Sequence, residues 1–482
     1  MTFASMTSWL FPLHVGVDQN CFLTVAREWT KGRLPYRDLY EQKGPLLYLL
    51  HLPAAWMPGL RFFGVYLVQI ILWTLILQTV MRLAGILLPD ADRTQKRRIA
   101  AWSALVIVTA RCYSLGDNAE EFCLLPVLLS LCDLLETAKQ RKADCPPRVL
   151  LRNGLLAGCV LWIKFSMLGF FIGWCIVIGV LIWRDCGFLR AVRAGLWFLL
   201  GMALASLPWL LYFGLNGAIG DLINVYFVSN ATLYPRKITL TDRFLDFFRS
   251  DLYKNPVMVP LILFGAWFSM RKKSLREKAA VWVTMLLLYV FVFIGGVRYR
   301  YYLLILGAYV PFGIAAAEML FVQYLRAFRG RLLTGVRLAV YPAVLLLTGN
   351  CLPYLGKARA AYPQVQFAAY IGQGDVLLNY GFLDGGFFLM SGAELPQSRF
   401  FCKLNIDRGQ LPEMYEEQER IIAERAADFV VIRKETAEKW DEKYEYAPFY
   451  QYYERIAEAE EPHLGYCFAL YQRRSDAAAA LS

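Results

Sequence analysis

The sequence has few of the residues on which metal and redox centres are usually built. It has three histidines, and its eleven cysteines form no C-x-x-C pair and no other metal-ligand spacing. A zinc site made of the usual histidine and cysteine ligands is therefore not expected. Cys123, Cys132, Cys159 and Cys175 fall in apolar runs, where a buried free thiol is typical. Cys21, Cys402 and Cys467 lie outside these runs and could pair in an oxidising compartment.

Charged residues are also scarce. They make up 19% of the 482 residues, whereas apolar residues make up 57%, compared with about 25% and about 45–50% in soluble globular proteins. The mean hydropathy is +0.39. This composition excludes a disordered chain, a disulfide-rich miniprotein and an ordinary cytosolic enzyme. It indicates a membrane protein that crosses the bilayer many times.

The net charge of +12 does not indicate a nucleic-acid partner, because it is unevenly distributed. Residues 351–482 contain 14 Lys and Arg against 20 Asp and Glu, a net charge of −6, so the first 350 residues carry +18. The basic excess lies between the apolar segments, where membrane topology requires it.

Ten apolar runs predict spans, each of which needs about 20 residues. They occupy roughly residues 62–84, 99–115, 120–137, 149–163, 165–184, 195–214, 256–270, 279–296, 301–320 and 333–350. Five of the loops between them are basic and are expected in the cytoplasm, at roughly residues 93–98, 139–148, 184–193, 271–278 and 326–331. The loops at residues 115–119, 215–254 and 295–300 then face outward.

The apolar run at residues 45–58 would invert every later loop if it crossed the membrane. We therefore interpret it as an interfacial helix on the outer side. Residues 1–44 and everything after residue 350 then also lie outside. An outward N-terminus needs a preceding span, and residues 1–17 are too short and too mixed to be one. We expect the natural chain to begin upstream, with one further span.

Two parts are expected. An all-α polytopic membrane domain covers residues 1–350, with residues 1–60 forming the outer loop and the interfacial helix. A small extracytoplasmic α/β domain covers residues 351–482. In this second part, residues 375–380, 428–432 and 465–472 are typical of strands, and residues 412–427 are typical of an amphipathic helix. The glycine-rich residues 379–386 lack the G-x-G-x-x-G spacing and only weakly indicate a nucleotide site.

Charged residues collect at the outer face in three segments. The first loop contains Asp18, Arg27, Glu28, Lys31, Arg33, Arg37, Asp38, Glu41 and Lys43. The second segment contains Asp117, Glu120 and Glu121, and the third contains Arg298 and Arg300 beside Tyr299, Tyr301 and Tyr302. A carboxylate at this depth can deprotonate an acceptor hydroxyl, and a cation beside it can hold a lipid phosphate as a leaving group. The pattern therefore favours transfer of a group from a lipid phosphate to an outward-facing acceptor.

Each of these residues also has a structural interpretation. Asp18 could be a helix N-cap, Glu120 and Glu121 could sit at a helix N-terminus, and Lys43 could be an interfacial anchor. The third segment is also typical of an aromatic belt with flanking charge. Lys164, which falls between two apolar runs, could merely mark an outer turn.

In order and spacing, the motifs resemble those of the GT-C membrane glycosyltransferases. The similarity is greatest to the protein-mannosyltransferase-like and aminoarabinose-transferase-like group, glycosyltransferase family 39. Asp18 is followed by G-R-L-P-Y-R-D at residues 32–38 and by K-G-P at residues 43–45, and N-A-E-E-F at residues 118–122 resembles the second acidic motif. The resemblance covers roughly residues 10–350.

This resemblance implies roles for eight residues. Asp18 corresponds to the catalytic base, Lys43 to the residue that contacts the donor phosphate, and Glu120, with Glu121 beside it, to the second acidic position. Further donor-phosphate contacts are expected from Arg37, Arg298, Arg300 and Tyr302. Asp18-Gln19 stands where many relatives carry Asp-Glu, which makes a bound metal less expected. No metal ligand is predicted, and a divalent cation remains an open alternative.

The resemblance thus implies an inverting glycosyltransferase of the cell membrane with an outward-facing site. Its partners would be a polyprenyl-phosphate sugar donor and a lipid, glycan or protein acceptor, with no nucleic acid. The alternatives are a multi-span transporter or flippase, and a polysaccharide polymerase or ligase of the cell envelope. A transporter would need charges deep within its spans or internal repeats, whereas here the charges gather at one face.

Overall fold

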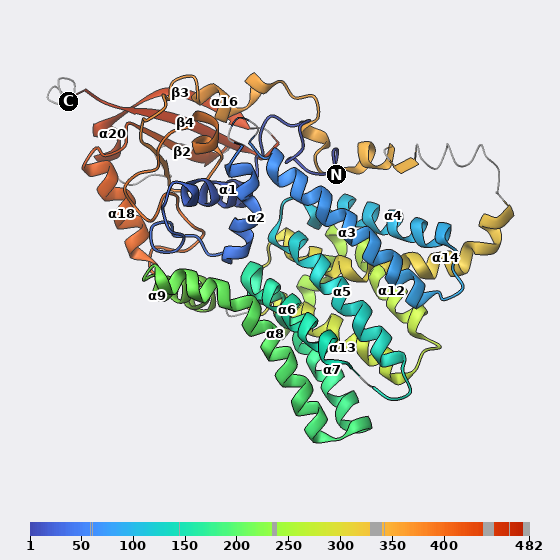
Figure 1. Ribbon diagram of the computed structural model, residues 1–482. Helices are drawn as coiled ribbons and strands as arrows, with labels where there is room; N and C mark the ends of the chain where they lie inside the picture. The colour runs from blue at the N-terminus through green and yellow to red at the C-terminus, as the bar shows by residue number, and fades with distance from the viewer. Residues whose placement is uncertain are drawn as a thin grey trace.

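The computed structural model describes residues 1–475 except for residues 58, 60, 144, 234–238, 328–339, 342, 437–447 and 462. Figure 1 shows a bundle of long helices with a small twisted sheet at one end. The first two helices, α1 (Val17–Thr30) and α2 (Pro45–Ala55), lie between the bundle and the sheet. The prediction of a mostly helical chain with a small α/β part near its C-terminus is confirmed.

The bundle helices coincide with nine of the ten apolar runs. They are α3 (Phe63–Leu87), α4 (Arg93–Thr109), α5 (Ala119–Lys139), α6 (Pro147–Lys164), α7 (Gly169–Cys186), α8 (Phe188–Leu215), α12 (Met258–Met270), α13 (Leu275–Val292), and the 3-10 helix η6 (Arg300–Tyr309) continuing into α14 (Val310–Ala327). The tenth run, residues 333–350, lies partly outside the described residues.

Four segments of the described chain are long and apolar enough to cross a membrane. They are Phe63–Leu87, Pro147–Cys186, Phe188–Leu215 and Arg300–Leu320. The shorter helices α2 and α12 do not reach that length. The total of ten crossings therefore stays a prediction.

The 40-residue segment Pro147–Cys186 is a hairpin of two helices. Its backbone becomes extended at Lys164, with φ −158° and ψ 99°, so the chain reverses there. Both ends of the hairpin meet again, because the Ala143 amide donates to Asp185 Oδ2 at 2.8 Å. α6 has 18 residues and is therefore about 27 Å long, close to the thickness of a bilayer core.

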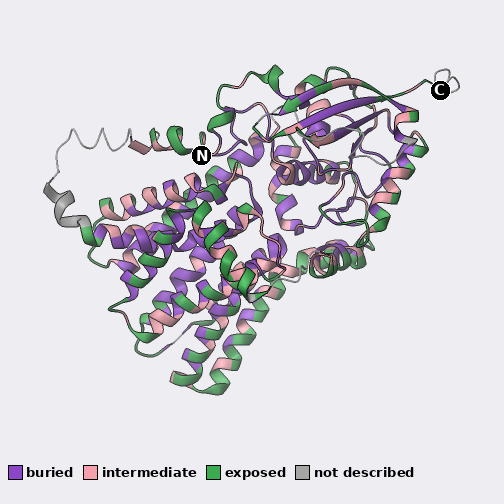
Figure 2. Ribbon diagram, turned by 180° about the vertical axis from the view of Figure 1, so that it is seen from behind, coloured by how far each residue is buried: buried purple, intermediate pink, exposed green. Residues whose placement is uncertain are grey.

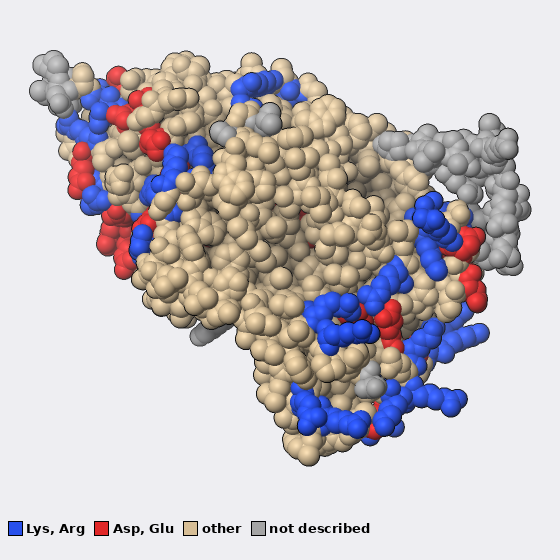
Figure 3. All heavy atoms as spheres, in the orientation of Figure 1, with Lys and Arg blue, Asp and Glu red and all other residues tan. Residues whose placement is uncertain are grey.

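Basic side chains gather at the end of the bundle that lies away from the sheet (Figure 3). Arg276 pairs with Asp185 at 2.6 Å and donates to the Arg141 carbonyl at 3.2 Å, so three of the basic loops meet at this end. Between the two ends, the bundle has a buried interior and an exposed exterior (Figure 2), and many of the exposed residues are large and apolar, such as Leu196, Leu199 and Leu211 on α8. Only 17% of the apolar window of α8 is buried, as expected for a helix that contacts lipid.

Short helices occupy the outer side of the bundle. They are α9 (Ile219–Leu222), the π-helix η4 (Ile223–Val228), α10 (Ser229–Thr232), α11 (Leu240–Asp246), the π-helix η5 (Phe247–Leu252), and, nearer the sheet, α16 (Pro363–Phe367) and α17 (Phe387–Ser391). The described residues also form four short 3-10 helices, which are η2 (Arg111–Tyr113), η3 (Phe165–Leu168), η7 (Leu352–Tyr354) and η8 (Arg359–Ala361).

The sheet has the strand order β1-β2-β4-β3. Its strands are β1 (Leu377–Tyr380), β2 (Phe429–Glu435), β3 (Tyr453–Glu461) and β4 (Tyr466–Arg473), with α18 (Pro412–Ala423) and α20 (Pro448–Tyr452) between them. β1 pairs with β2 in parallel, with Leu378 opposite Val430, and the other pairs are antiparallel. β1, β2, β4 and α18 match the predicted elements. α18 ends earlier than predicted, and Arg425 just beyond it has a left-handed φ of 54°.

The glycine-rich residues 379–386, which begin within β1, contact α1. Asp384 is fully buried there, where its carboxylate accepts from Thr24 Oγ1 at 2.6 Å and from the Gly386 amide at 2.8 Å. Desolvation raises the pKa of Asp384. Gly386 has φ +86°, and an added Cβ would lie 2.9 Å from Asn20 Oδ1. These glycines therefore serve the contact between the two parts of the chain.

We expect Gly386→Ala to weaken this contact. The left-handed backbone and the contact with Asn20 both oppose a side chain, and the cost should be about 1–3 kcal/mol. Thermal unfolding in detergent, followed by tyrosine and tryptophan fluorescence, measures it. Gly409→Ala is the matched control, because nothing lies within 4 Å of its added Cβ. Equal melting temperatures for the two variants would contradict this account.

Candidate active site

A cavity of about 370 Å³ lies where the bundle meets the C-terminal part. Its walls come from the start of α1, the loop before α2, the α6–α7 turn, η4 and the segment before η6. The C-terminal part contributes Leu383, Leu404, Asn405, Arg433, Leu464 and Tyr466. Four of the eight predicted site residues line this cavity: Asp18, Lys43, Arg300 and Tyr302.

Asp18 lies in the first turn of α1, and its carboxylate is held by a tyrosine. Tyr301 Oη donates to Asp18 Oδ2 at 2.6 Å. The Tyr301 ring stacks on Tyr299 at 5.7 Å, and Asn405 Nδ2 donates to Tyr299 Oη at 3.4 Å. Asp18 is not the N-cap of α1, because Gly16 holds that position with no side-chain cap. Its carboxylate therefore has no capping role and lies in the wall of the cavity.

Lys43 is positioned by the K-G-P motif. An added Cβ on Gly44 would lie 2.0 Å from the Trp162 carbonyl oxygen, so only glycine allows this loop to approach α6 so closely. Pro45 then begins α2. The Lys43 amide donates to Glu41 Oε2 at 3.0 Å, and its ammonium lies 3.6 Å from Glu41 Oε1.

Lys164 is a second lysine of the cavity, and the sequence interpretation missed it. It lies at the reversal between α6 and α7, is 9% exposed, and forms an ion pair with Glu120. Its ammonium also lies over the Tyr302 ring, 3.7 Å from the ring centre, and it interacts electrostatically with Asp18 and Lys43. The sequence did offer one indication of this role. Lys164 is a lone lysine between two apolar runs, and the predicted topology places it on the same side of the membrane as the acidic motif at residues 117–121.

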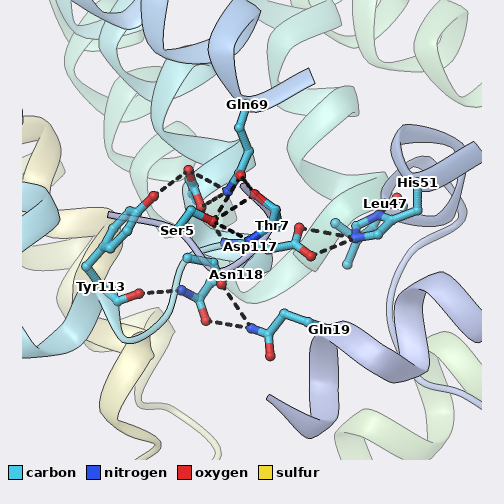
Figure 4. Close-up of polar contacts among 11 residues, drawn as sticks. Ser5, Thr7, Gln19, Leu47, His51, Gln69, Tyr113, Asp117 and Asn118 are labelled. Atoms are coloured by element: carbon cyan, nitrogen blue, oxygen red, sulfur yellow. Dashed lines mark hydrogen bonds and ion pairs between the residues drawn. The ribbon is translucent and has the colours of Figure 1, made fainter. Parts of the chain in front are cut away.

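Glu120 is thus the partner of Lys164 and does not itself line the cavity. Its neighbour Glu121 points elsewhere, because successive helical residues differ by about 100° in direction. Glu121 accepts from Gln69 Nε2 at 3.0 Å, Trp73 Nε1 at 2.6 Å and Tyr113 Oη at 3.0 Å. Gln69 and Tyr113 belong to a buried polar network that also contains Ser5, Thr7 and Asp117 (Figure 4).

This network also holds the loop that carries the acidic motif. Asp117 has a left-handed φ of 60°, and its carboxylate lies 3.1 Å from His51 Nε2 on α2. Its amide donates to Glu121 Oε2 at 2.8 Å. Asn118 accepts from Gln19, the residue after Asp18, at 3.2 Å. The second acidic segment therefore supports the wall from which Asp18 projects.

The other predicted arginines are engaged outside the cavity. Arg37 is about half exposed and pairs with Asp38 at 2.9 Å, which lowers the pKa of Asp38. Arg298 pairs with Asp251 at 2.7 Å and with Asp246 at 3.1 Å. Neither lines the cavity. Arg300 does, as an exposed side chain at its rim.

The donor set of this cavity does not fit a metal ion. Asp18 accepts from Tyr301, and Glu41 is bound by Lys43 and Tyr48. Within the described ranges, no three His, Cys, Asp or Glu residues are grouped as metal ligands would be.

Two comparisons by sequence gave no relative, since no protein-family model and no curated protein matches the chain. Solved structures do match. The crystal structure of ArnT from Cupriavidus metallidurans bound to undecaprenyl phosphate has a TM-score of 0.62 and 15% identity, over 97% of this chain and 96% of that one. The apo form of that protein has a TM-score of 0.59 and 15% identity, over 95% and 94%. The chain therefore has the fold of these ArnT structures.

We expect Glu121→Ala to destabilise the protein by about 3 kcal/mol or more, because Gln69, Trp73 and Tyr113 would lose a buried acceptor. Glu136→Ala is the control: Glu136 is 46% exposed in its pair with Arg82, and such a pair contributes about 1 kcal/mol or less. Thermal unfolding in detergent compares them. A Glu121 variant as stable as the Glu136 variant would contradict a supporting role for the network.

Proposed function

We propose that the protein is a membrane glycosyltransferase that moves a sugar from a polyprenyl-phosphate donor to an extracytoplasmic acceptor. The observation that carries this proposal is the cavity itself, where one carboxylate, Asp18, shares a small space with Lys43, Lys164 and the tyrosines of η6. The ArnT structure with undecaprenyl phosphate supports the donor class, since its fold extends over 97% of this chain.

Asp18 acts as the general base. It removes the proton from an acceptor hydroxyl, whose oxygen attacks the anomeric carbon of the donor sugar while the bond from that carbon to the phosphate oxygen breaks. Tyr301 orients the carboxylate through its 2.6 Å hydrogen bond. Phosphate leaves on the lipid as a dianion, so the transition state develops negative charge on the leaving side.

Lys43 and Lys164 stabilise that charge, with Tyr302 beside Lys164 and Arg300 at the rim. Charge-assisted hydrogen bonds in a cavity shielded from water are well suited to this task. Glu120 holds Lys164 in place through their ion pair, because a buried ammonium needs a counterion. Glu120 thus acts through the lysine.

The reaction inverts the anomeric centre. Retention by a double displacement needs a second carboxylate as nucleophile, about 5–5.5 Å from the first. The other cavity carboxylate, Glu41, is bound by Lys43 and Tyr48 and cannot take that role without losing both. One base and one direct displacement fit the residues present.

The cavity faces away from the cytoplasm. It lies at the opposite end of the bundle from the basic loops, which the positive-inside rule places inside. A lipid-linked donor suits this side, because its phosphate lies at the level of the membrane surface.

Asp18→Asn should lower transfer by about 10²–10⁴-fold, the usual contribution of a general base. The assay incubates purified protein with radiolabelled polyprenyl-phosphate sugars and an acceptor extract, and it follows release of lipid phosphate. Asp221→Asn, on α9 and outside the cavity lining, should retain full activity. Wild-type turnover by the Asp18 variant would exclude Asp18 as the base.

Lys43→Gln and Lys164→Gln should each raise the donor KM about 10- to 100-fold, since a hydrogen bond to a charged group contributes about 1.5–3 kcal/mol. Lys254→Gln, an exposed lysine outside the cavity, is the matched control. An unchanged donor KM in both cavity variants would show that the phosphate binds elsewhere.

A further inference from the structure

Two cysteines from distant parts of the chain face each other in the structure. Cys21 Sγ on α1 lies 3.9 Å from Cys402 Sγ, and 381 residues separate them in sequence. Each is 1% exposed. Both lie outside the apolar runs, and they meet where α1 contacts the C-terminal part of the chain.

The two cysteines lie close in sequence to residues that line the cavity. Cys21 is one helical turn beyond Asp18. Cys402 shortly precedes Leu404 and Asn405, which line the cavity from the other side. Asn405 in turn contacts Tyr299, which stacks on the tyrosine that holds Asp18. A bond between the thiols would therefore link the C-terminal wall of the cavity, which contains Leu404 and Asn405, to α1, the helix that carries Asp18.

The surrounding backbone already holds both sides in place. The Tyr40 amide donates to the Arg399 carbonyl at 2.7 Å, and Arg27 Nη1 donates to the Phe388 carbonyl at 3.1 Å. Thr24 reaches Asp384 across the same contact.

A disulfide needs its sulfurs about 2.05 Å apart. The two sulfurs therefore have to move closer than their present 3.9 Å for the bond to form.

We propose that Cys21 and Cys402 form a disulfide in the mature protein, which links the C-terminal part of the chain covalently to α1. The proposal takes from the proposed function only that this junction faces outward, where disulfides persist. The oxidant is the disulfide of a thiol–disulfide oxidoreductase of that compartment. One cysteine thiolate attacks it to form a mixed disulfide, and the second displaces the enzyme. Two protein thiols are oxidised, and the oxidant leaves as two thiols.

The exchange must precede docking of the two parts. Burial raises the pKa of the Cys21 thiol, and a buried thiol is neither accessible nor sufficiently ionised to react. Once formed, the bond closes a loop of about four-fifths of the chain, which strongly restricts the unfolded state.

Peptide mapping of the full-length protein tests the proposal. Cells are denatured directly in N-ethylmaleimide, and the unreduced protein is digested with trypsin. We expect peptide 1–27 linked to peptide 400–403, and no alkylated Cys21 or Cys402. In Cys402→Ser the link should disappear and Cys21 should be alkylated, whereas Cys123→Ser should keep the link. Alkylation of both Cys21 and Cys402 in the wild type, or linkage of Cys21 to another cysteine, would overturn the proposal.

The effect of a reductant on the melting temperature gives a second readout. A loss of packing at residue 402 would not by itself make the melting temperature depend on reductant. Reductant should lower the melting temperature of the wild type by about 3–10 °C and leave Cys402→Ser unchanged. An equal response of both proteins would count against the disulfide. Because neither measurement uses sugar transfer, a linked protein whose Asp18→Asn variant remains active would contradict the proposed function and leave the disulfide standing.

Discussion

The close approach of Gly44 to the end of α6 is the contact on which the rest of the cavity depends. The Gly44 amide donates to the Ile163 carbonyl at 3.1 Å, and an added Cβ would overlap the Trp162 carbonyl. This contact brings the loop before α2 against the turn between α6 and α7. Lys43 and Lys164 come from segments more than a hundred residues apart. The close approach of Gly44 to α6 makes both lysines part of the wall of one cavity. The glycine beside Lys43 is thus a requirement of backbone packing, and the proline that follows it begins α2.

Buried charge around the cavity is tolerated because each group has a partner. Lys164 has Glu120, Asp117 has His51, and Glu121 accepts from several donors at once. An unpaired charge at these depths would cost several kcal/mol. The neighbouring glutamates therefore serve different purposes: Glu120 sustains a cation of the cavity, and Glu121 holds the scaffold together.

Local patterns in the sequence predicted the bundle helices, three strands and the importance of the first loop. Apolar runs and the K-G-P motif act over a few residues, so they can be read without knowing the fold. Strand β3 was missed because its nine residues include five charged ones and lack the apolar pattern of its neighbours. Lys164 was missed because its partner lies on another helix. Arg37 and Arg298 were assigned to the donor site, but nearby carboxylates, Asp38 and Asp251, hold them outside the cavity. Such pairings depend on contacts that no local pattern reveals.

The central claim is that a lipid phosphate binds between Lys43 and Lys164, on the side of the cavity facing Asp18. A cryo-electron microscopy structure of the protein in nanodiscs with an added polyprenyl phosphate tests it most directly. The account predicts phosphate density within hydrogen-bonding distance of both lysine ammonium groups. Density at Arg37 or Arg298 instead, with the cavity free of lipid, would contradict it.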